Sequence, residues 1–195
     1  ALMIIAATPI ALILAFGMTL LPEAIGEQLR SIRTVTITTI FFALLLWWAD
    51  MKGGNHRAES DMKLADAVFI GATQAIAAIL PGTSRSGITM TAARGLGFSR
   101  IEAARFSMLI GAPLLAAGGA YAILELVSAA PGSITLGVAE AALIVFLSFA
   151  SALVSIWGLM AVLKRMSFLP FVVYRILLGV ALIAANPIAF GLVTA

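Results

Sequence analysis

The sequence predicts an all-α polytopic membrane protein with about five transmembrane helices and one re-entrant helical hairpin. Of the 195 residues, 62% are hydrophobic and only 11% are charged, and the mean hydropathy is +1.12. Because a transmembrane helix needs ~20 apolar residues, residues 1–195 are long enough for several spans in a single membrane domain. The hairpin is predicted by a polar, glycine-rich stretch that interrupts one of the apolar runs.

Charged residues, prolines and glycines divide the chain into its apolar runs. The first run ends at Pro22-Glu23, and the second ends at Trp47-Trp48, a pair of the kind that anchors helices at a membrane interface. Ser99 with Glu102 three residues later is a capping-box pattern that marks the start of the next helix. In order, the expected long helices cover residues 2–21, 31–49, 99–127, 138–163 and 170–185.

The interrupted run has two short arms, residues 64–80 and 88–96. At ~1.5 Å per residue the first arm reaches about 25 Å and the second far less, so neither clearly spans a bilayer. Most of the twelve lysines and arginines lie in three places, namely Lys52, Arg57 and Lys63; Arg94, Arg100 and Arg105; and Lys164 and Arg165. If all three are cytoplasmic, residues 64–97 form a re-entrant hairpin with residues 81–87 near the middle of the membrane. Such hairpins are typical of inverted-repeat folds, so we expect this chain to be part of one.

The start of the chain has neither the basic segment nor the small-residue cleavage site of a signal peptide. It begins at Ala1 and enters an apolar run at once. We therefore expect an N-terminally truncated fragment of a longer protein.

Composition excludes several kinds of site and partner. The absence of cysteine rules out disulfides, thiolate metal sites and cysteine nucleophiles. The net charge of +3 is scattered through short loops and forms no basic stripe, so no nucleic-acid partner is expected. The single histidine, His56, lies in a charged loop and is not expected to be catalytic.

The polar stretch reads Pro-Gly-Thr-Ser-Arg-Ser-Gly-Ile-Thr, from Pro81 to Thr89. Pro81 ends the first arm, while Gly82 and Gly87 allow a tight turn and the close approach of a ligand. Arg85 offers a planar set of N–H donors, and the N-terminus of the second arm adds backbone N–H groups and a positive helix dipole. Hydroxyl groups come from Ser84, Ser86 and Thr89. This combination predicts an anion site, with phosphate as the best-fitting ligand.

Two other interpretations of this stretch need to be weighed. Residues 82–89 fit the spacing G-x-x-x-x-G-x-T of a P-loop, but a P-loop needs a preceding strand and a lysine where this sequence has Ile88. The stretch could also be a simple helix connection in which Arg85 extends to lipid headgroups. The density of glycine and hydroxyl residues around one arginine favours the anion site.

At these residues the sequence resembles the undecaprenyl-diphosphatase family, also called the bacitracin-resistance protein family. The resemblance rests on residues 81–89, on Gln74 before them, on Phe98-Ser99-Arg100, and on residues 167–171 with Tyr174-Arg175. It suggests that the chain corresponds to the C-terminal two-thirds of such a protein.

The resemblance implies a multi-pass protein of the bacterial inner membrane that hydrolyses undecaprenyl diphosphate to undecaprenyl phosphate and phosphate. This reaction recycles the lipid carrier of cell-wall peptidoglycan synthesis, and the implied active site faces the periplasm. Arg85 would bind the diphosphate, and Ser84 and Thr89 would form hydrogen bonds to it as the other catalytic residues. The implied substrate-binding residues are Gly82, Thr83, Ser86, Gly87 and Gln74.

The resemblance also implies a divalent cation, Mg or Ca. In the family a second hairpin with two glutamates and a serine-histidine stretch is thought to supply the nucleophile, the acid/base group and the metal ligands, and this sequence has no counterpart. We therefore expect the metal ligands to lie mainly outside this chain, and the fragment alone to bind without useful turnover. The expected partners are a polyprenyl diphosphate lipid, the bilayer and, in a homodimer, a second copy of the chain.

A competing hypothesis assigns the same kind of ligand to the loop but no hydrolysis. In a transporter or flippase for an anionic polyprenyl lipid, the same loop would bind the headgroup without cleaving it. The predicted topology fits both hypotheses.

Overall fold

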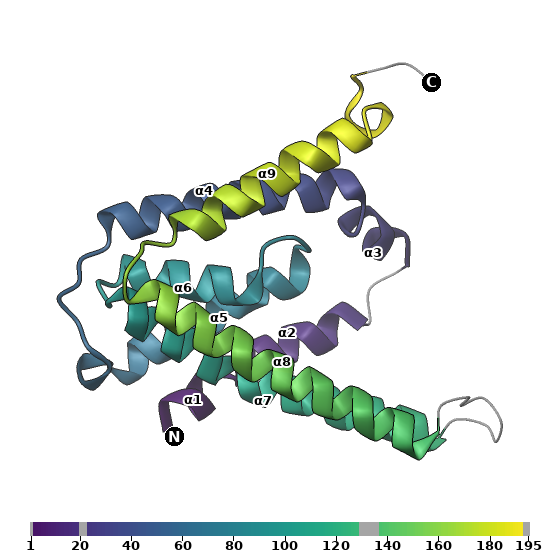
Figure 1. Ribbon diagram of the computed structural model, residues 1–195, viewed down its shortest axis with the longest axis horizontal. Helices are drawn as coiled ribbons and strands as arrows, with labels where there is room; N and C mark the ends of the chain where they lie inside the picture. Colours follow the sequence, from purple (N-terminus) through teal and green to yellow (C-terminus); the bar gives the residue numbers. More distant parts are fainter. Residues whose placement is uncertain (1, 20–22, 129–136, 193–195) are drawn as a thin grey trace. The chain divides into compact units, whose positions relative to one another are not determined.

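The computed structural model describes residues 2–19, 23–128 and 137–192, and every regular element in these ranges is helical (Figure 1). Two elements, η1 (Glu59–Asp61) and η2 (Ile188–Phe190), are single turns of 3-10 helix. The α-helices are α1 (Leu2–Ala7), α2 (Pro9–Thr19), α3 (Glu23–Leu29), α4 (Ile32–Lys52), α5 (Leu64–Ile79), α6 (Arg85–Gly95), α7 (Arg100–Ser128), α8 (Val138–Leu163) and α9 (Leu169–Ala185).

The helices from α4 onward confirm the sequence prediction closely. Ser31 caps α4, because its hydroxyl accepts a hydrogen bond from the Thr34 N–H at 3.3 Å. Ser99 caps α7 in the same way, with the Glu102 N–H as the donor at 3.3 Å. The two arms of the hairpin are α5 and α6, joined by a short turn. The predicted linker before α8 falls mostly on residues 129–136, which lie outside the described part.

The single helix predicted for residues 2–21 is wrong, because the chain bends between α1 and α2. Pro9 has no N–H to donate, and its ring disfavours the helical conformation at Thr8. The Thr8 hydroxyl donates instead to the Ile4 carbonyl at 2.7 Å and closes the end of α1. Residues 20 and 21 of the predicted span are not among those described.

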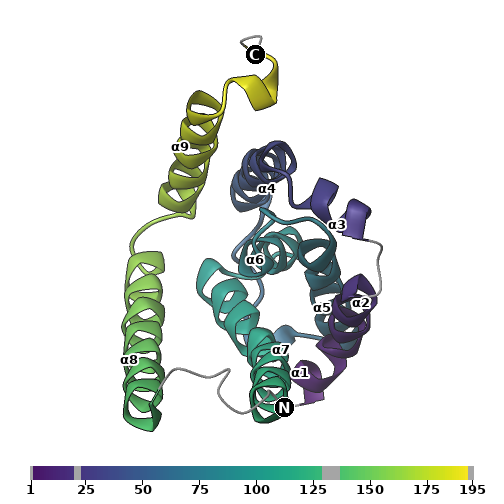
Figure 2. The ribbon, with the colours of Figure 1, turned by 90° about the vertical axis from the view of Figure 1, so that its right-hand side faces the viewer.

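The chain divides into two compact units, of which the first holds residues 1–114 and 167–195. Within this unit α5 packs against α1, α2 and α6, and α4 packs against α6 and α9. Figure 2 shows the hairpin helices α5 and α6 between α4 and the α1–α2 pair. Ile70, Phe98, Phe106 and Ile110 form part of a buried apolar core here. The α5–α6 hairpin is therefore held on several sides by neighbouring helices.

The second unit, residues 115–166, contains the rest of α7 and all of α8. Most of its described side chains are apolar and exposed, including Phe146, Leu153 and Trp157. A helix that is apolar all round suits a lipid environment better than water. Three helical segments are long and apolar enough to cross a membrane, Ile32–Lys52, Arg100–Leu124 and Ala139–Leu163. The chain is an all-α polytopic membrane protein.

Candidate anion-binding site

The turn between α5 and α6 requires an unusual backbone at two positions. Gly82 has φ +89°, and a Cβ atom there would overlap the Thr38 hydroxyl and the Val35 carbonyl of α4. Only glycine combines this conformation with such a close approach to another helix. Ser84 is the only described residue other than glycine with a positive φ, at +67°, and its hydroxyl caps α6 by accepting from the Gly87 N–H at 3.2 Å. Strain of this kind in a non-glycine residue is commonest at functional sites.

The carbonyl groups of the turn are held by side chains from two other helices. The Thr38 hydroxyl of α4 donates to the Pro81 carbonyl, and the Thr39 hydroxyl donates to the Gly82 carbonyl at 3.3 Å. From α9, Nη2 of Arg175 donates to the Gly82 carbonyl at 2.5 Å and to the Thr83 carbonyl at 3.0 Å. These bonds occupy the acceptors of the turn and leave its donors for a ligand.

Several N–H groups of the turn are in fact unpaired. The Thr83, Gly87 and Ile88 N–H groups find acceptors within the turn itself. In contrast, no described residue accepts from the N–H of Gly82, Ser84, Arg85 or Ser86. Unpaired N–H groups at the start of a helix form a positive site suited to an anion, and the α6 dipole adds to it.

Arg85 lies beside this site and extends to α7. Its Nη1 donates to the Gly111 carbonyl at 2.9 Å, and a Cβ atom on Gly111 would lie only 2.6–2.8 Å from three guanidinium atoms. No described carboxylate lies within 4 Å of the Arg85 guanidinium nitrogens. Arg85 is therefore held by a backbone carbonyl and keeps its positive charge uncompensated.

The other predicted site residues lie deeper in the structure. Thr83 is buried, and its hydroxyl donates to the Leu80 carbonyl at 2.7 Å. Thr89 is 1% exposed, and its hydroxyl donates to the Arg85 and Ser86 carbonyls at 3.0 and 3.1 Å. Gln74 faces α1, where its Nε2 donates to the Ala7 carbonyl at 3.5 Å. The structure thus groups Gly82, Ser84, Arg85, Ser86 and Gly87 at the turn, whereas the predicted roles of Thr83, Thr89 and Gln74 gain no direct geometric support.

Sequence reasoning missed the three residues that hold the turn. Thr38, Thr39 and Arg175 are more than 40 residues away in the chain, so no local pattern joins them to it. One signal was present, because Arg175 is the only charged residue within the apolar run that forms α9. A charged residue in such a run generally has a functional partner.

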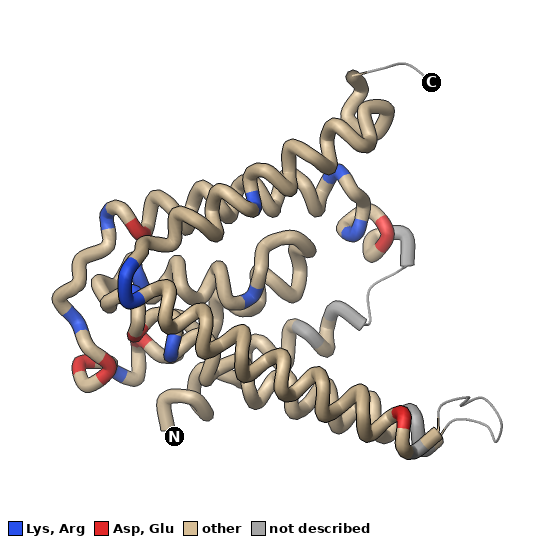
Figure 3. The backbone as a smooth tube through the Cα atoms, viewed as in Figure 1, with Lys and Arg blue, Asp and Glu red and all other residues tan. Residues whose placement is uncertain are grey.

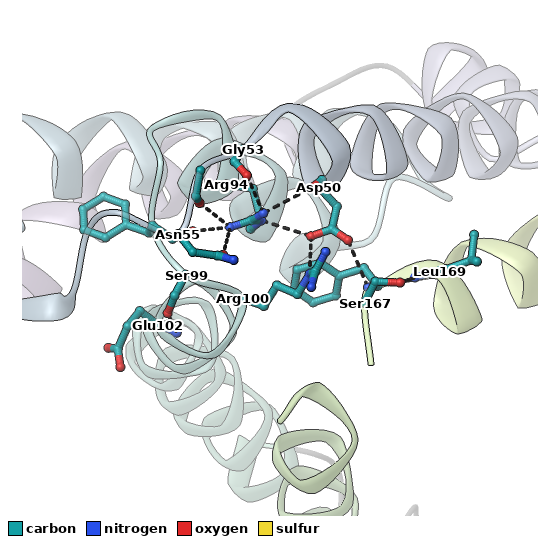
Figure 4. Close-up of polar contacts among 12 residues, drawn as sticks. Asp50, Gly53, Asn55, Arg94, Ser99, Arg100, Glu102, Ser167 and Leu169 are labelled. Atoms are coloured by element: carbon teal, nitrogen blue, oxygen red, sulfur yellow. Dashed lines mark hydrogen bonds and ion pairs between the residues drawn. The ribbon is translucent and has the colours of Figure 1, made fainter. Parts of the chain in front are cut away.

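A separate cluster of charges lies at the opposite end of the hairpin, where α4 and α6 both end (Figure 4). Asp50 accepts from Nε of Arg94 at 3.1 Å, from Nε of Arg100 at 2.8 Å and from the Phe168 N–H at 3.2 Å. Figure 3 shows acidic and basic residues together around the loop after α4. Arg94 is 1% exposed, and each of its five N–H groups has an acceptor. Because the charges of Asp50 and Arg94 are satisfied by these contacts, we assign the Asp50 cluster the role of joining helices.

The fold and the turn together define an integral membrane protein with a candidate anion-binding site at the tip of a helical hairpin. The donors of this site are Arg85 and the unpaired N–H groups at the start of α6. The chain belongs to the family described as Bacitracin resistance protein BacA, whose profile matches residues 1–181.

Curated proteins similar to this chain are named undecaprenyl-diphosphatase. An undecaprenyl-diphosphatase of Hyphomonas neptunium is 53% identical over 192 residues, which are 98% of this chain and 67% of the relative. Those of a Jannaschia species and of Chromohalobacter salexigens are 42% and 44% identical, over 93% and 84% of this chain and 66% and 60% of their own lengths. The chain thus spans about two thirds of the length of these relatives.

Proposed function

We propose that this protein acts in the hydrolysis of undecaprenyl diphosphate to undecaprenyl phosphate and inorganic phosphate, which recycles the lipid carrier of cell-wall synthesis. The observation that carries the proposal is the turn before α6, where backbone donors and the uncompensated Arg85 converge. Membership of the BacA family and the names of the relatives supply the reaction and the lipid. They favour hydrolysis over transport without cleavage.

In the overall reaction the oxygen of water becomes bonded to the terminal phosphorus, the bond from that phosphorus to the bridging oxygen breaks, and the protons of water pass to the phosphate products and the solvent. Undecaprenyl phosphate is the leaving group. Arg85 and the N–H groups of the turn stabilise the negative charge on the transferred phosphoryl group, because donors fixed in advance need no reorganisation during the reaction. The Ser84 side chain is exposed beside these donors and adds a further contact. Thr89 would contact substrate only if its hydroxyl left the Arg85 and Ser86 carbonyls.

A divalent cation does not fit the residues at this turn. Mg and Ca prefer oxygen ligands, chiefly carboxylates, and the side chains that surround the turn offer guanidinium groups and hydroxyls. No group of three or more acidic, histidine or cysteine residues in the described part of the chain could hold a metal ion. We therefore propose that any Mg or Ca ion in the reaction is held mainly by ligands outside these residues.

The proposal also covers the location of the protein in the membrane and its oligomeric state. The distribution of lysine and arginine supports a multi-pass protein of the bacterial inner membrane whose site opens to the periplasm. A homodimer remains a prediction, which the mass of the purified protein in detergent would check.

The proposal is tested by replacing Arg85 with lysine in the full-length protein and measuring phosphate release from undecaprenyl diphosphate. Lysine keeps the charge but loses the fork that binds both a phosphoryl oxygen and the Gly111 carbonyl, so we expect a fall of about 100-fold. Arg165→Lys is the matched control, because Arg165 is exposed and has no carboxylate partner among the described residues. Unchanged phosphate release in Arg85→Lys would contradict the assigned role.

A further inference from the structure

The lysines and arginines of the described structure are either exposed or paired with a carboxylate, with two exceptions. Arg57, Arg94 and Arg100 are shielded and each forms an ion pair. Arg85 and Arg175 are also partly buried, but neither has a described carboxylate within 4 Å. An unpaired cation in an apolar region is unfavourable unless something anionic binds there. Both exceptions lie at the same turn.

The two ends of the Arg175 guanidinium have different surroundings. Nη2 donates to the Gly82 and Thr83 carbonyls, which fixes the plane of the group against the turn. Nη1 is buried and has no hydrogen-bond partner in the described structure. A buried donor without an acceptor is costly and rare in proteins, so its presence calls for a ligand.

The free Nη1 lies next to the start of α6. It is 3.1 Å from the point that a Cβ atom on Gly87 would occupy, and Oγ of Ser84 is 3.2 Å from the same point. Because Gly87 has no side chain, Nη1 and the Ser84 side chain both lie close to the point that a Cβ atom would occupy. The unpaired N–H groups of Arg85 and Ser86 belong to the same helical turn.

We propose that Arg175 is a second phosphate-binding residue, and that the site grips both phosphoryl groups of a diphosphate between Arg85, held by α7, and Arg175, carried by α9. This inference rests on the proposed function and narrows it. A single phosphate needs only Arg85 and the N–H groups of the turn. With a second guanidinium in place, the site binds a diphosphate more tightly than a monophosphate. It therefore holds the monophosphate products more weakly than the substrate.

The test measures binding of inorganic pyrophosphate and of inorganic phosphate to the full-length protein in detergent, by calorimetry. Arg175→Gln keeps a side-chain N–H for the Gly82 and Thr83 carbonyls but removes the charge. We expect its pyrophosphate affinity to fall by about 10- to 100-fold, and its phosphate affinity to fall much less, because the loss is that of one charge-assisted contact to the second phosphoryl group. Arg165→Gln, which removes an exposed arginine, should leave both affinities unchanged.

A second variant decides the question if Arg175→Gln does not fold. Gly87→Ala removes no charge and places a methyl group 3.1 Å from Nη1, and alanine favours the α6 helix. We expect a folded protein that binds pyrophosphate at least about 10-fold more weakly, since even a small misplacement of binding groups lowers affinity strongly. Gly95→Ala is the control, because a Cβ atom there would meet nothing within 4 Å.

The outcomes separate this inference from the proposed function. Pyrophosphate binding that is unchanged in Arg175→Gln or, where that variant does not fold, in Gly87→Ala overturns the role of Arg175. An equal loss of phosphate and pyrophosphate binding in Arg175→Gln also overturns it, since that result means that Arg175 only holds the turn. Hydrolysis of the lipid by the unmodified protein can still be seen in either case. If the unmodified protein binds pyrophosphate through Arg175 but never releases phosphate from the lipid, the proposed function fails and the binding role stands.

Discussion

Gly111 sets the position of Arg85, although it lies on a different helix and 26 residues away in the chain. The Arg85 guanidinium lies over the α7 backbone at this point, and any larger residue would occupy its place. Arginine is suited to this arrangement because one edge of its fork can bind a carbonyl while the other faces a ligand. The chemistry assigned to Arg85 therefore depends on a residue that has no functional group.

We predict that Gly111→Ala lowers phosphate release without lowering stability. The methyl group would lie 2.6–2.8 Å from the guanidinium atoms, so Arg85 must leave its position. Displacing a catalytic group by about 1 Å costs on the order of 100-fold in rate. Alanine is favoured over glycine in a helix by up to ~1 kcal/mol, so the melting temperature should stay level or rise.

The control for this prediction lies on the same helix. A Cβ atom on Gly118 would meet nothing within 4 Å, so Gly118→Ala makes the same chemical change without touching Arg85. Both variants are compared by phosphate release and by thermal unfolding in detergent. Equal activity of Gly111→Ala and Gly118→Ala would show that the position of Arg85 does not matter.

At the scale of elements, the α5–α6 hairpin is fixed at both ends by its neighbours. Side chains from α4 and α9 hold the tip through the carbonyls of the turn. The Asp50 cluster holds the base, where the end of α4 meets the end of α6 and the starts of α7 and α9. Helix α4 thus contacts the hairpin at both ends, and the Phe168 N–H links the start of α9 to Asp50 of α4.

We predict that Asp50→Asn strongly destabilises the protein. Removing this charge leaves Arg94, which is 1% exposed, without an ionic partner, and the loss of one partner of a buried pair costs about 3–5 kcal/mol. Glu59→Gln is the matched control, because the Glu59–Arg105 pair is exposed and such pairs contribute about 0–1 kcal/mol. Thermal unfolding of both variants in detergent measures the difference. Similar melting temperatures would mean that the Asp50 cluster does not stabilise the fold.

The helical elements could be predicted from the sequence because their signals are local. Ser31 and Ser99 mark the starts of α4 and α7, and the charged loops separate the apolar runs. The prediction failed between α1 and α2, where Pro9 stands inside an apolar run and separates it into two helices. Hydrophobicity alone sets the length of a run, and it does not show where the backbone bends.

The site was predicted only in part, for the same reason. The glycines and Arg85 of residues 81–89 are adjacent in sequence, so their chemistry could be inferred together. The supports of the turn come from α4, α7 and α9, which meet it only in the folded chain. Their participation depends on helix packing, which neither spacing nor composition shows.

At the scale of the whole molecule, the distribution of charge indicates how the chain lies in a bilayer. The loop that connects α4 and α5 is rich in charged residues, whereas the residues that follow α9 carry none. By the positive-inside rule, we expect the α4–α5 loop to face the cytoplasm. Because α9 starts from the same side in the predicted topology, we expect the residues after it to face the periplasm.

Cysteine labelling in intact cells checks this orientation, and the chain suits the method because it contains no cysteine. We expect an impermeant maleimide to label Ile188→Cys, since residue 188 is 61% exposed and follows α9. His56→Cys in the exposed α4–α5 loop should react only after the membrane is permeabilised. The unmodified chain is the control for background. Labelling of His56→Cys in intact cells would reverse the orientation. The base of the hairpin, where α5 begins and α6 ends, would then lie on the periplasmic side, and the turn with Arg85 would be approached from the cytoplasm.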